Sequence, residues 1–447
     1  MSIHTYSDAQ KYLESLIPNA QNKRYTNMRL ERIEHILRLI NNPHHSFQSI
    51  HVGGTSGKGS TAYLISRLLT TAGYKIGLHI SPHLQTVNER MQINNQPISN
   101  QEFTDLVNWI KPYVDKVEEN NLYGTPSYFE VLVALSFEYF KRKKVDLAVI
   151  EVGLGGTLDA TNVINPLIAI ITNVSLDHIE ILGDTIEKIA EDKSGIIKNN
   201  SLVITGATQK TVIDSIKKKC FEKNASLVIV DTDARYQIKK STINGSLFDL
   251  QTNNCQYHDL KLSLLGRHQV KNAICAILAV ESLEKYQFTI DEKHIRRAFS
   301  TAFFAGRMEI VRHNPTIILD GAHNPAKMNA LAEAMHELFH QKVIVVIGFK
   351  QKKDSDGMIS ALLPIVHRFI ITTFSTMTDT GKNLSTHPLK IAKIVEKHAP
   401  SLPYIHMPTA TAAIEYILKQ SDPNDIILIT GSLYLVGEIR SILKNKS

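Results

Sequence analysis

The chain contains ten short apolar runs, and most are followed by a polar or glycine-containing turn and then by a stretch with helical spacing. Short runs rich in isoleucine and valine, separated by helical patterns, are typical of buried parallel strands joined by crossover helices. The runs fall into two series, which predicts two α/β domains. They cover residues 47–52, 75–80, 147–152, 167–172, 202–205 and 227–230 in the first series, and 316–319, 342–347, 368–373 and 425–430 in the second.

Length agrees with this count, since 447 residues are too many for one hydrophobic core and suit two or three domains. We predict a first domain over residues 1–300 and a smaller second domain over 301–447, with a hinge near 301–307. Residues 236–264 alternate like antiparallel hairpins, and we interpret them as a β-excursion at the end of the first domain. A helical pattern follows over residues 268–285.

Composition narrows the class of protein and its ligands. Hydrophobic residues make up 43% and charged residues 21%, close to a globular average, and the net charge of +7 is a mild bias. Such a charge suits small anions such as nucleotides or polycarboxylates, and we expect neither nucleic-acid nor membrane partners. Three unpaired cysteines and the absence of a signal-like N-terminus predict a cytoplasmic protein; the cysteines are Cys220, Cys255 and Cys275.

The sharpest motif is the sequence GGTSGKGS at residues 53–60, between the first apolar run and a helical pattern over 61–70. Glycines allow backbone N–H groups to turn toward phosphates, the helix N-terminus adds positive potential, and Lys58 can reach the outer phosphates. The spacing departs from the common phosphate loop, because Gly59 separates Lys58 from the hydroxyl of Ser60. The alternative is a glycine-rich turn with an incidental lysine.

Polar side chains follow two further runs. Glu151 ends the third run, where a buried carboxylate is costly unless it meets a cation or a donor. Ligands of open α/β sheets bind at the carboxyl ends of strands, so a magnesium-bound nucleotide would satisfy it; the alternative is a helix cap or a lysine pair. His178 follows the next run as a metal-ligand candidate or an ordinary loop histidine. Lys193, judged by residue type alone, is a surface lysine.

The motifs taken together resemble the folylpolyglutamate synthase and dihydrofolate synthase family, which belongs with the Mur-type ligases. They occur in the family's order across nearly the whole chain, which chance does not explain. They are residues 54–60, 80–84, 88–91, 93–99, 127–130, 151–162, 176–178, 191–196, 266–273, 306–309 and 320–325.

The resemblance implies an N-terminal phosphate-loop α/β domain, like the central domain of Mur ligases, and a smaller C-terminal Rossmann-like α/β domain. It implies ATP-dependent ligation of L-glutamate to a folate-type carboxylate through an acyl phosphate, with ATP, a reduced folate or dihydropteroate, and L-glutamate as substrates and Mg²⁺ as cofactor. Two domains closing over a cleft would protect the acyl phosphate from water. We expect a monomer.

The resemblance also assigns roles to individual residues. The ATP site is expected to contain Gly54, Thr55, Ser56, Gly57, Lys58, Gly59, Ser60, Asn272, Arg307 and Asp320. Magnesium is expected at Ser81, Glu151 and His178, and the pteridine side at Ser127, Leu158, Asp159 and Ala160. The catalytic set is Lys58, Lys193 and His323, with Lys193 expected as a carbamate.

Four positions depart from the family's pattern. Ser56 stands where asparagine is usual, Ile80 and Ser127 stand where threonine is usual, and Thr157 replaces an arginine on the folate side. Substrate preference, and the balance between dihydropteroate and folate substrates, are therefore open. Two other functions also remain: a Mur-type cell-wall peptide ligase, and a nucleotide-responsive binding protein without catalysis. Gly59 and residues 81–84 favour the folate branch.

Overall fold

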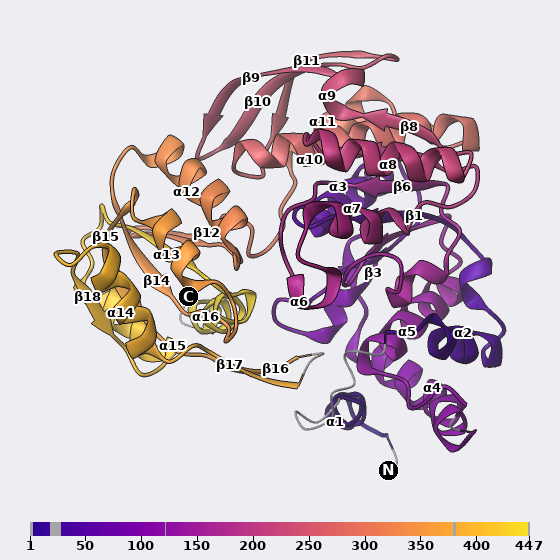
Figure 1. The fold of residues 1–447 in the computed structure, drawn as a ribbon, viewed down its shortest axis with the longest axis horizontal. Coiled ribbons are helices and arrows are strands. Elements are labelled where there is room, and N and C mark those ends of the chain that lie inside the picture. Colours follow the sequence, from indigo (N-terminus) through magenta and orange to yellow (C-terminus); the bar gives the residue numbers. More distant parts are fainter. Residues whose placement is uncertain (1–2, 18–27, 121, 379–380, 446–447) are drawn as a thin grey trace. The chain divides into compact units, whose positions relative to one another are not determined.

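The computed structural model describes residues 3–17, 28–120, 122–378 and 381–445. The chain divides into two compact units, each built on its own sheet (Figure 1). The first unit comprises residues 1–237, 248–261 and 269–302, and the second comprises residues 238–247, 262–268 and 303–447. Both are α/β units with mostly parallel strands, as the two series of apolar runs predicted.

The first unit contains an eight-stranded sheet in the order β4-β3-β2-β5-β1-β6-β7-β8. In this order, the six strands β2-β5-β1-β6-β7-β8 are parallel, and β3 and β4 add an antiparallel edge beside β2. The bounds are Gln48–Gly53 (β1), Ile76–His79 (β2), Met91–Ile93 (β3), Gln96–Pro97 (β4), Leu147–Glu151 (β5), Ile168–Ile171 (β6), Leu202–Thr205 (β7) and Ser226–Ile229 (β8).

The predicted strands of this sheet form within about two residues of their expected bounds because they are buried on both faces. Every residue of β2, β5, β6 and β7 is buried, which is the environment of a parallel strand covered by helices. The edge hairpin β3–β4 was not predicted. Its turn residues Asn94 and Asn95 have φ values of 53° and 60°, so an Asn-Asn pair makes the left-handed turn that a two-residue hairpin needs.

Helices surround this sheet and supply two of the hydrophobic cores. α5 begins with a capping box between Ser127 and Glu130. Its last turn contains Lys141, Arg142 and Lys143, whose positive charges interact favourably with the negative end of the helix dipole. The helices are α1 (Tyr6–Ser15), α2 (Leu30–Leu39), α3 (Lys58–Thr71), α4 (Asn100–Asn120), α5 (Tyr128–Lys143), α6 (Ile179–Leu182), α7 (Ile186–Ser194), α8 (Lys210–Glu222), α9 (Val230–Asp233), α10 (Arg267–Ser282) and α11 (Glu292–Ser300).

The predicted β-excursion forms a sheet of its own. Strands β9 (Arg235–Thr242), β10 (Gly245–Gln251) and β11 (Gln256–Leu262) lie in the order β11-β10-β9, with the short connections of antiparallel neighbours. We expected this segment at the end of the first domain. Its residues are instead divided between the two units.

The second unit contains a six-stranded sheet in the order β12-β13-β19-β14-β15-β18, parallel except for the β12–β13 pair. The edge strands β12 and β18 were not predicted, because half-exposed polar residues interrupt their apolar pattern. The strands are β12 (Glu309–His313), β13 (Thr316–Leu319), β14 (Val343–Ile347), β15 (Val366–Ile371), β18 (Tyr404–His406) and β19 (Ile426–Thr430), with a separate hairpin of β16 (Ser375–Thr378) and β17 (Gly381–Leu384).

The helices of the second unit pack on this sheet, and the first three of them in chain order share a hydrophobic core with its strands. They are α12 (Pro325–Phe339), α13 (Ser355–Leu362), α14 (Pro388–His398), α15 (Ala410–Gln420) and α16 (Leu433–Asn445). Across the described part of the chain, no helix is both long enough and apolar enough to cross a bilayer.

Candidate active site

The segment between β1 and α3 has the geometry of a phosphate-binding loop. β1 ends at Gly53 and α3 begins at Lys58, so the glycine-rich residues connect a buried strand directly to a helix N-terminus. Gly57 precedes the helix with a φ of 80°, which glycine adopts without steric penalty, and no described side chain caps the helix. The first N–H groups of α3 are therefore left for an anionic ligand.

The segment after β6 holds this loop in place. The Thr172 hydroxyl donates to the Ser56 carbonyl oxygen at 2.6 Å, and the Ser56 N–H donates to Asn173 Oδ1 at 2.9 Å. The Thr55 N–H donates to the Asn173 carbonyl oxygen at 2.9 Å, and its hydroxyl accepts the Ser175 N–H at 3.0 Å. Because β6 pairs directly with β1, the loop is fixed to its neighbouring strand.

Asn272 of α10 packs against the same loop. A β-carbon on Gly57 would lie 2.5 Å from Asn272 Oδ1, so a larger residue would clash there. Asn272 Nδ2 donates to Gln269 Oε1 at 2.9 Å, which turns Oδ1 toward the loop. The structure thus brings Asn272 beside the predicted phosphate loop, from far along the chain.

Glu151 and Ser81, two of the predicted magnesium ligands, are in direct contact. Glu151 ends β5, pairs in register with Val52 of β1, and is only 5% exposed. The Ser81 N–H donates to Glu151 Oε2 at 2.8 Å. The buried carboxylate therefore has the donor that its position requires. It lies at the end of β5, which is the neighbour of β1, the strand that leads into the phosphate loop.

His178, the third predicted ligand, stands at the start of α6 with a φ of 52°. Its ring nitrogens lie 3.8 Å from Asp177 Oδ1 and 3.9 Å from Glu180 Oε1. Among the residues that the structure describes, no three His, Cys, Asp or Glu side chains are grouped as a metal site. The residues present nevertheless fit a magnesium ion that has Glu151 as its carboxylate ligand and takes most of its other ligands from hydroxyl, phosphate and water oxygens. Mg²⁺ that is bound together with a nucleotide is usually held in this way.

Lys193 lies at the C-terminal end of α7 and is only 4% exposed. Its Nζ donates to the carbonyl oxygen of Gly54 at 3.2 Å. Burial, and after it the charge of Lys58, lowers the pKa of Lys193 to about 8. Residue type alone indicated a surface lysine, and that interpretation is wrong, because α7 directs the side chain into the phosphate loop.

Asp159 is buried and organises the loop that follows β5. Its Oδ2 accepts the Leu154 N–H at 2.8 Å, and its Oδ1 accepts both the N–H of Thr161, at 3.0 Å, and the Thr161 hydroxyl. Burial raises the pKa of Asp159, and these hydrogen bonds oppose the rise. Its neighbour Leu158 is 46% exposed, while Ala160 is buried. Of these three residues, Leu158 offers accessible surface and Asp159 shapes the loop.

Ser127 and Thr157 are both engaged in local hydrogen bonds. The Ser127 hydroxyl accepts the Glu130 N–H at 3.3 Å and so starts α5. Both the N–H and the hydroxyl of Thr157 donate to the Asp192 carbonyl oxygen, at 3.0 and 2.9 Å. Thr157 therefore joins the loop after β5 to the residue that precedes Lys193.

In the second unit, Asp320 follows β13 and is buried. Its Oδ2 accepts the Met308 N–H at 3.0 Å, and its Oδ1 accepts the Ala322 N–H at 2.8 Å. Burial raises the pKa of Asp320, and the neighbouring charge of Arg307 opposes the rise. Asp320 thus fixes the segment that carries Arg307.

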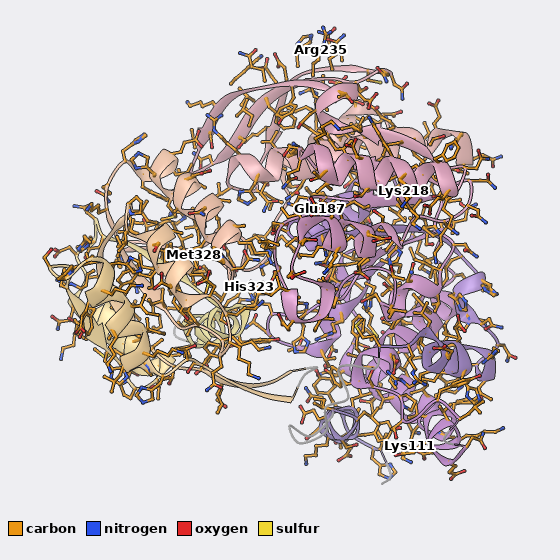
Figure 2. The ribbon with its side chains drawn as sticks, viewed as in Figure 1. Lys111, Glu187, Lys218, Arg235, His323 and Met328 are labelled. Atoms are coloured by element: carbon orange, nitrogen blue, oxygen red, sulfur yellow. The ribbon has the colours of Figure 1, made fainter. Side chains whose placement is uncertain are left out.

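His323 lies just before α12, the helix that carries Met328 (Figure 2). His323 Nδ1 donates to the Gly321 carbonyl oxygen at 2.8 Å, since a carbonyl can only accept. Lys327 Nζ lies 3.0 Å from Nε2 and donates to it. Both ring nitrogens are therefore engaged, and in this arrangement the imidazole is a neutral acceptor.

Comparison with known proteins gives this arrangement its context. The family model of the Mur ligase middle domain matches residues 52–280, and that of the Mur ligase glutamate ligase domain matches residues 306–433. The chain is 36% identical over 419 residues to the dihydrofolate synthase/folylpolyglutamate synthase of Bacillus subtilis, covering 93% of this chain and 95% of that protein. The chain belongs to the dihydrofolate synthase/folylpolyglutamate synthase family.

Other relatives of this ligase agree with the assignment. The folylpolyglutamate synthase of Lacticaseibacillus casei is 31% identical, covering 92% of this chain and 94% of that protein. The structure of Mycobacterium tuberculosis folylpolyglutamate synthase complexed with ADP and AMPPCP superposes with a TM-score of 0.87 at 30% identity, covering 98% of this chain and 99% of that chain. The Thermotoga maritima folylpolyglutamate synthase gives a TM-score of 0.84 at 31% identity, covering 99% and 97%.

The sequence interpretation of this ligase missed the residues that hold its phosphate loop. Thr172, Asn173 and Ser175 contact Ser56 and Thr55 but were not included among the site residues. A signal was present, because polar residues come directly after the buried strand β6. Polar side chains at that point of a parallel sheet face the ligand edge, where β1 also ends.

Proposed function

We propose that this ligase joins L-glutamate to a folate-type carboxylate with ATP as the energy source. The observation that carries the proposal is the loop at residues 53–60, which leaves the N-terminus of α3 open to phosphate while Lys58 stands at its first position. The 36% identity to a dihydrofolate synthase/folylpolyglutamate synthase supplies the substrate class.

In the first step, a carboxylate oxygen of the folate-type substrate attacks the γ-phosphorus of ATP, the bond to the β-phosphate oxygen breaks, and ADP leaves. Lys58 and the N–H groups of α3 offset the negative charge that moves during this transfer. Ser81, Glu151 and His178 would hold Mg²⁺. When bound, that ion would supply positive charge that offsets part of the negative charge of the phosphates.

In the second step, the amine of glutamate attacks the acyl carbon, loses a proton, and displaces inorganic phosphate from the tetrahedral intermediate. We assign Asn272, Arg307 and Asp320 to the nucleotide and His323 to the catalytic group, as the resemblance implies. Because His323 Nε2 accepts from Lys327, it would act on substrate only after that hydrogen bond opens.

We propose that Lys193 is carbamylated. The neutral amine adds to carbon dioxide, and loss of one proton leaves an anionic carbamate with two oxygens suited to a hard cation. Burial supports this chemistry, because a pKa of about 8 leaves part of the amine neutral near neutral pH. A permanently cationic lysine beside a bound cation would be repelled.

On the acceptor side, we propose that Leu158 contacts the pteridine and that Ser127, Asp159 and Ala160 build the surface around it. Asp159 would act by fixing the loop, since both of its carboxylate oxygens already accept hydrogen bonds. We further propose a monomer that acts in the cytoplasm. Three free cysteines, two of them buried, suit a reducing compartment.

One assay tests the function directly. Purified protein is given ATP and Mg²⁺ with dihydropteroate or with tetrahydrofolate, and ADP formation is followed with and without L-glutamate. We expect glutamate-dependent ADP formation with at least one of the two acceptors, and the ratio between them assigns the preferred substrate. Activity only with a nucleotide-sugar peptide would indicate a cell-wall ligase, and nucleotide binding without turnover would indicate a binding protein.

A further inference from the structure

A buried hydrogen-bond chain links strand β1 to the loop that follows β5. His51 lies within β1, and Thr161 lies in the short helix η4 (Ala160–Val163). His51 Nε2 is 2.8 Å from the Thr161 hydroxyl, which in turn contacts Asp159 Oδ1. His51 and Thr161 are fully buried, and Asp159 is 1% exposed, so bulk solvent does not reach this chain.

The direction of each hydrogen bond follows from the number of available protons. The Asp159 carboxylate accepts from Leu154 and Thr161, and the single hydroxyl proton of Thr161 is used on that carboxylate. His51 Nε2 must therefore be the donor to Thr161 Oγ1. Burial lowers the pKa of His51 to about 3, so the ring is neutral and its proton sits on Nε2.

The other ring nitrogen of His51 shows that packing stability does not account for this residue. His51 Nδ1 is buried and has no hydrogen-bond partner among the described residues. A buried acceptor without a partner costs free energy, and an apolar residue of similar size would avoid that cost. A buried histidine that carries this cost points to a role in placing the groups it contacts.

We infer that His51 is a positioning residue for the acceptor side of the site: through Thr161 and Asp159 it fixes residues 153–162 and thereby the exposed Leu158. The inference rests on the proposed function, which places Leu158 at the pteridine. His51 lies on the strand that runs into the phosphate loop, and Asp159 holds the Leu154 N–H. The chain therefore ties the acceptor loop to the nucleotide-binding strand.

The test uses a matched pair at Thr161. Thr161→Val keeps the shape and removes the hydroxyl, so it should raise the KM for the folate-type acceptor about ten-fold while the KM for ATP stays within about two-fold. Thr161→Ser restores the hydroxyl and should recover most of the loss. Thr211→Val, an exposed threonine on α8, is the control and should change neither constant.

A spectroscopic readout separates positioning from folding. In ¹⁵N-histidine-labelled protein, with His51 assigned from a His51→Gln sample, we expect the Nε2–H tautomer in the wild type and in Thr161→Ser, and loss of that single tautomer in Thr161→Val. An unchanged acceptor KM in a folded Thr161→Val variant, or an equal rise in both KM values, would overturn the inference.

Two further arms keep the test decisive. If Thr161→Val does not fold, two variants of His51 replace it. His51→Gln keeps an N–H donor, whereas His51→Asn is too short to reach Thr161. Only His51→Asn should raise the acceptor KM. Equal acceptor KM values for these two variants would contradict the inference. A wild type without glutamate-dependent ADP formation would refute the proposed function instead, while a wild-type Nδ1–H tautomer would refute the chain itself.

Discussion

Lys193 Nζ donates to the carbonyl oxygen of Gly54 at 3.2 Å, so a side chain from α7 reaches into the loop between β1 and α3. The pKa of this lysine is lowered to about 8. Lys58 contributes, but burial is the larger cause. Two lysines thus meet at the phosphate loop: Lys58, which begins α3, and Lys193, which comes from α7 and is buried.

Lys193→Ala should be nearly inactive, because it removes the group that we propose as a carbamate. Acetate should restore part of the activity by supplying a carboxylate at the vacated position. The measurement is glutamate-dependent ADP formation with and without acetate, and chloride at equal ionic strength is the control. Lack of rescue, together with an unmodified Lys193 by mass spectrometry of the intact protein, would contradict the carbamate.

The depressed pKa also predicts how carbamylation depends on pH. Only the neutral amine reacts with carbon dioxide, and with a pKa of about 8 its fraction rises as pH passes from 7 to 9. Protein depleted of carbon dioxide should therefore regain activity faster at higher pH when the dissolved carbon dioxide is held constant. A rate of recovery that falls over this range would be inconsistent with the assignment.

Lys58→Ala should reduce glutamate-dependent ADP formation by about 10²-fold or more, because it removes a charge placed at the transferring phosphoryl group. Lys210→Ala is the matched control, since Lys210 lies on the exposed face of α8 and pairs with Asp214. Turnover should be compared at saturating ATP. Near-normal turnover of a folded Lys58→Ala protein would show that this loop does not serve phosphate transfer.

Glu151→Gln should weaken the magnesium dependence of the reaction more than it weakens folding. The amide oxygen can still accept the Ser81 N–H, so the local structure is kept while the charge is lost. The checks are a magnesium titration of activity and a thermal melt. His178→Ala should act in the same direction with a smaller effect, because it removes a neutral ligand, and titrations that match the wild type would exclude both residues.

Thr157→Arg should change the KM for the folate-type substrate and leave the KM for ATP almost unchanged. A guanidinium can pair with a carboxylate in a bidentate manner, which threonine cannot do. Because the Thr157 hydroxyl also donates to the Asp192 carbonyl oxygen, Thr157→Val measures the loss of that contact alone. A change confined to the ATP constant would move Thr157 to the nucleotide side.

Arg440→Met should destabilise the protein by about 3–5 kcal/mol, because it leaves a buried carboxylate without its cation. Arg440 Nε lies 2.8 Å from Glu309 Oε2, which also accepts the Gly306 N–H, and both side chains are buried. Urea unfolding of the full chain measures the loss. The double variant with Glu309→Met should recover part of it, and an equal or greater loss would contradict this account.

Local patterns were sufficient to predict the buried parallel strands and the loop-to-helix segment that follows the first of them. Apolar runs such as residues 202–205 and 316–319 match the observed strands because burial on both faces leaves a continuous apolar signature. The glycine-rich segment before Lys58 carries a similarly local signal, since a glycine at position 57 permits the φ of 80° from which α3 starts. The short edge strands β12 and β18 lack that signature, so the sequence did not reveal them.

Features that depend on distant contacts could not be read from the pattern. The Ser56–Asn173 hydrogen bond joins residues 117 positions apart. The burial of Lys193 depends on where α7 packs. The hydrogen bonds that occupy both carboxylate oxygens of Asp159 depend on the turn that these same bonds create. The roles assigned to individual site residues remain predictions, and the variants above test them.

The contact between Gly57 and Asn272 has a consequence for how the protein is made. The phosphate loop is synthesised early, but the side chain that packs against it belongs to α10, more than 200 residues later. A nascent chain in which α10 has not yet been synthesised therefore lacks the side chain that packs against the phosphate loop. Since domains fold as units during synthesis, nucleotide binding should arise only when translation has passed α10, and truncated chains that end earlier should neither bind ATP nor deplete it.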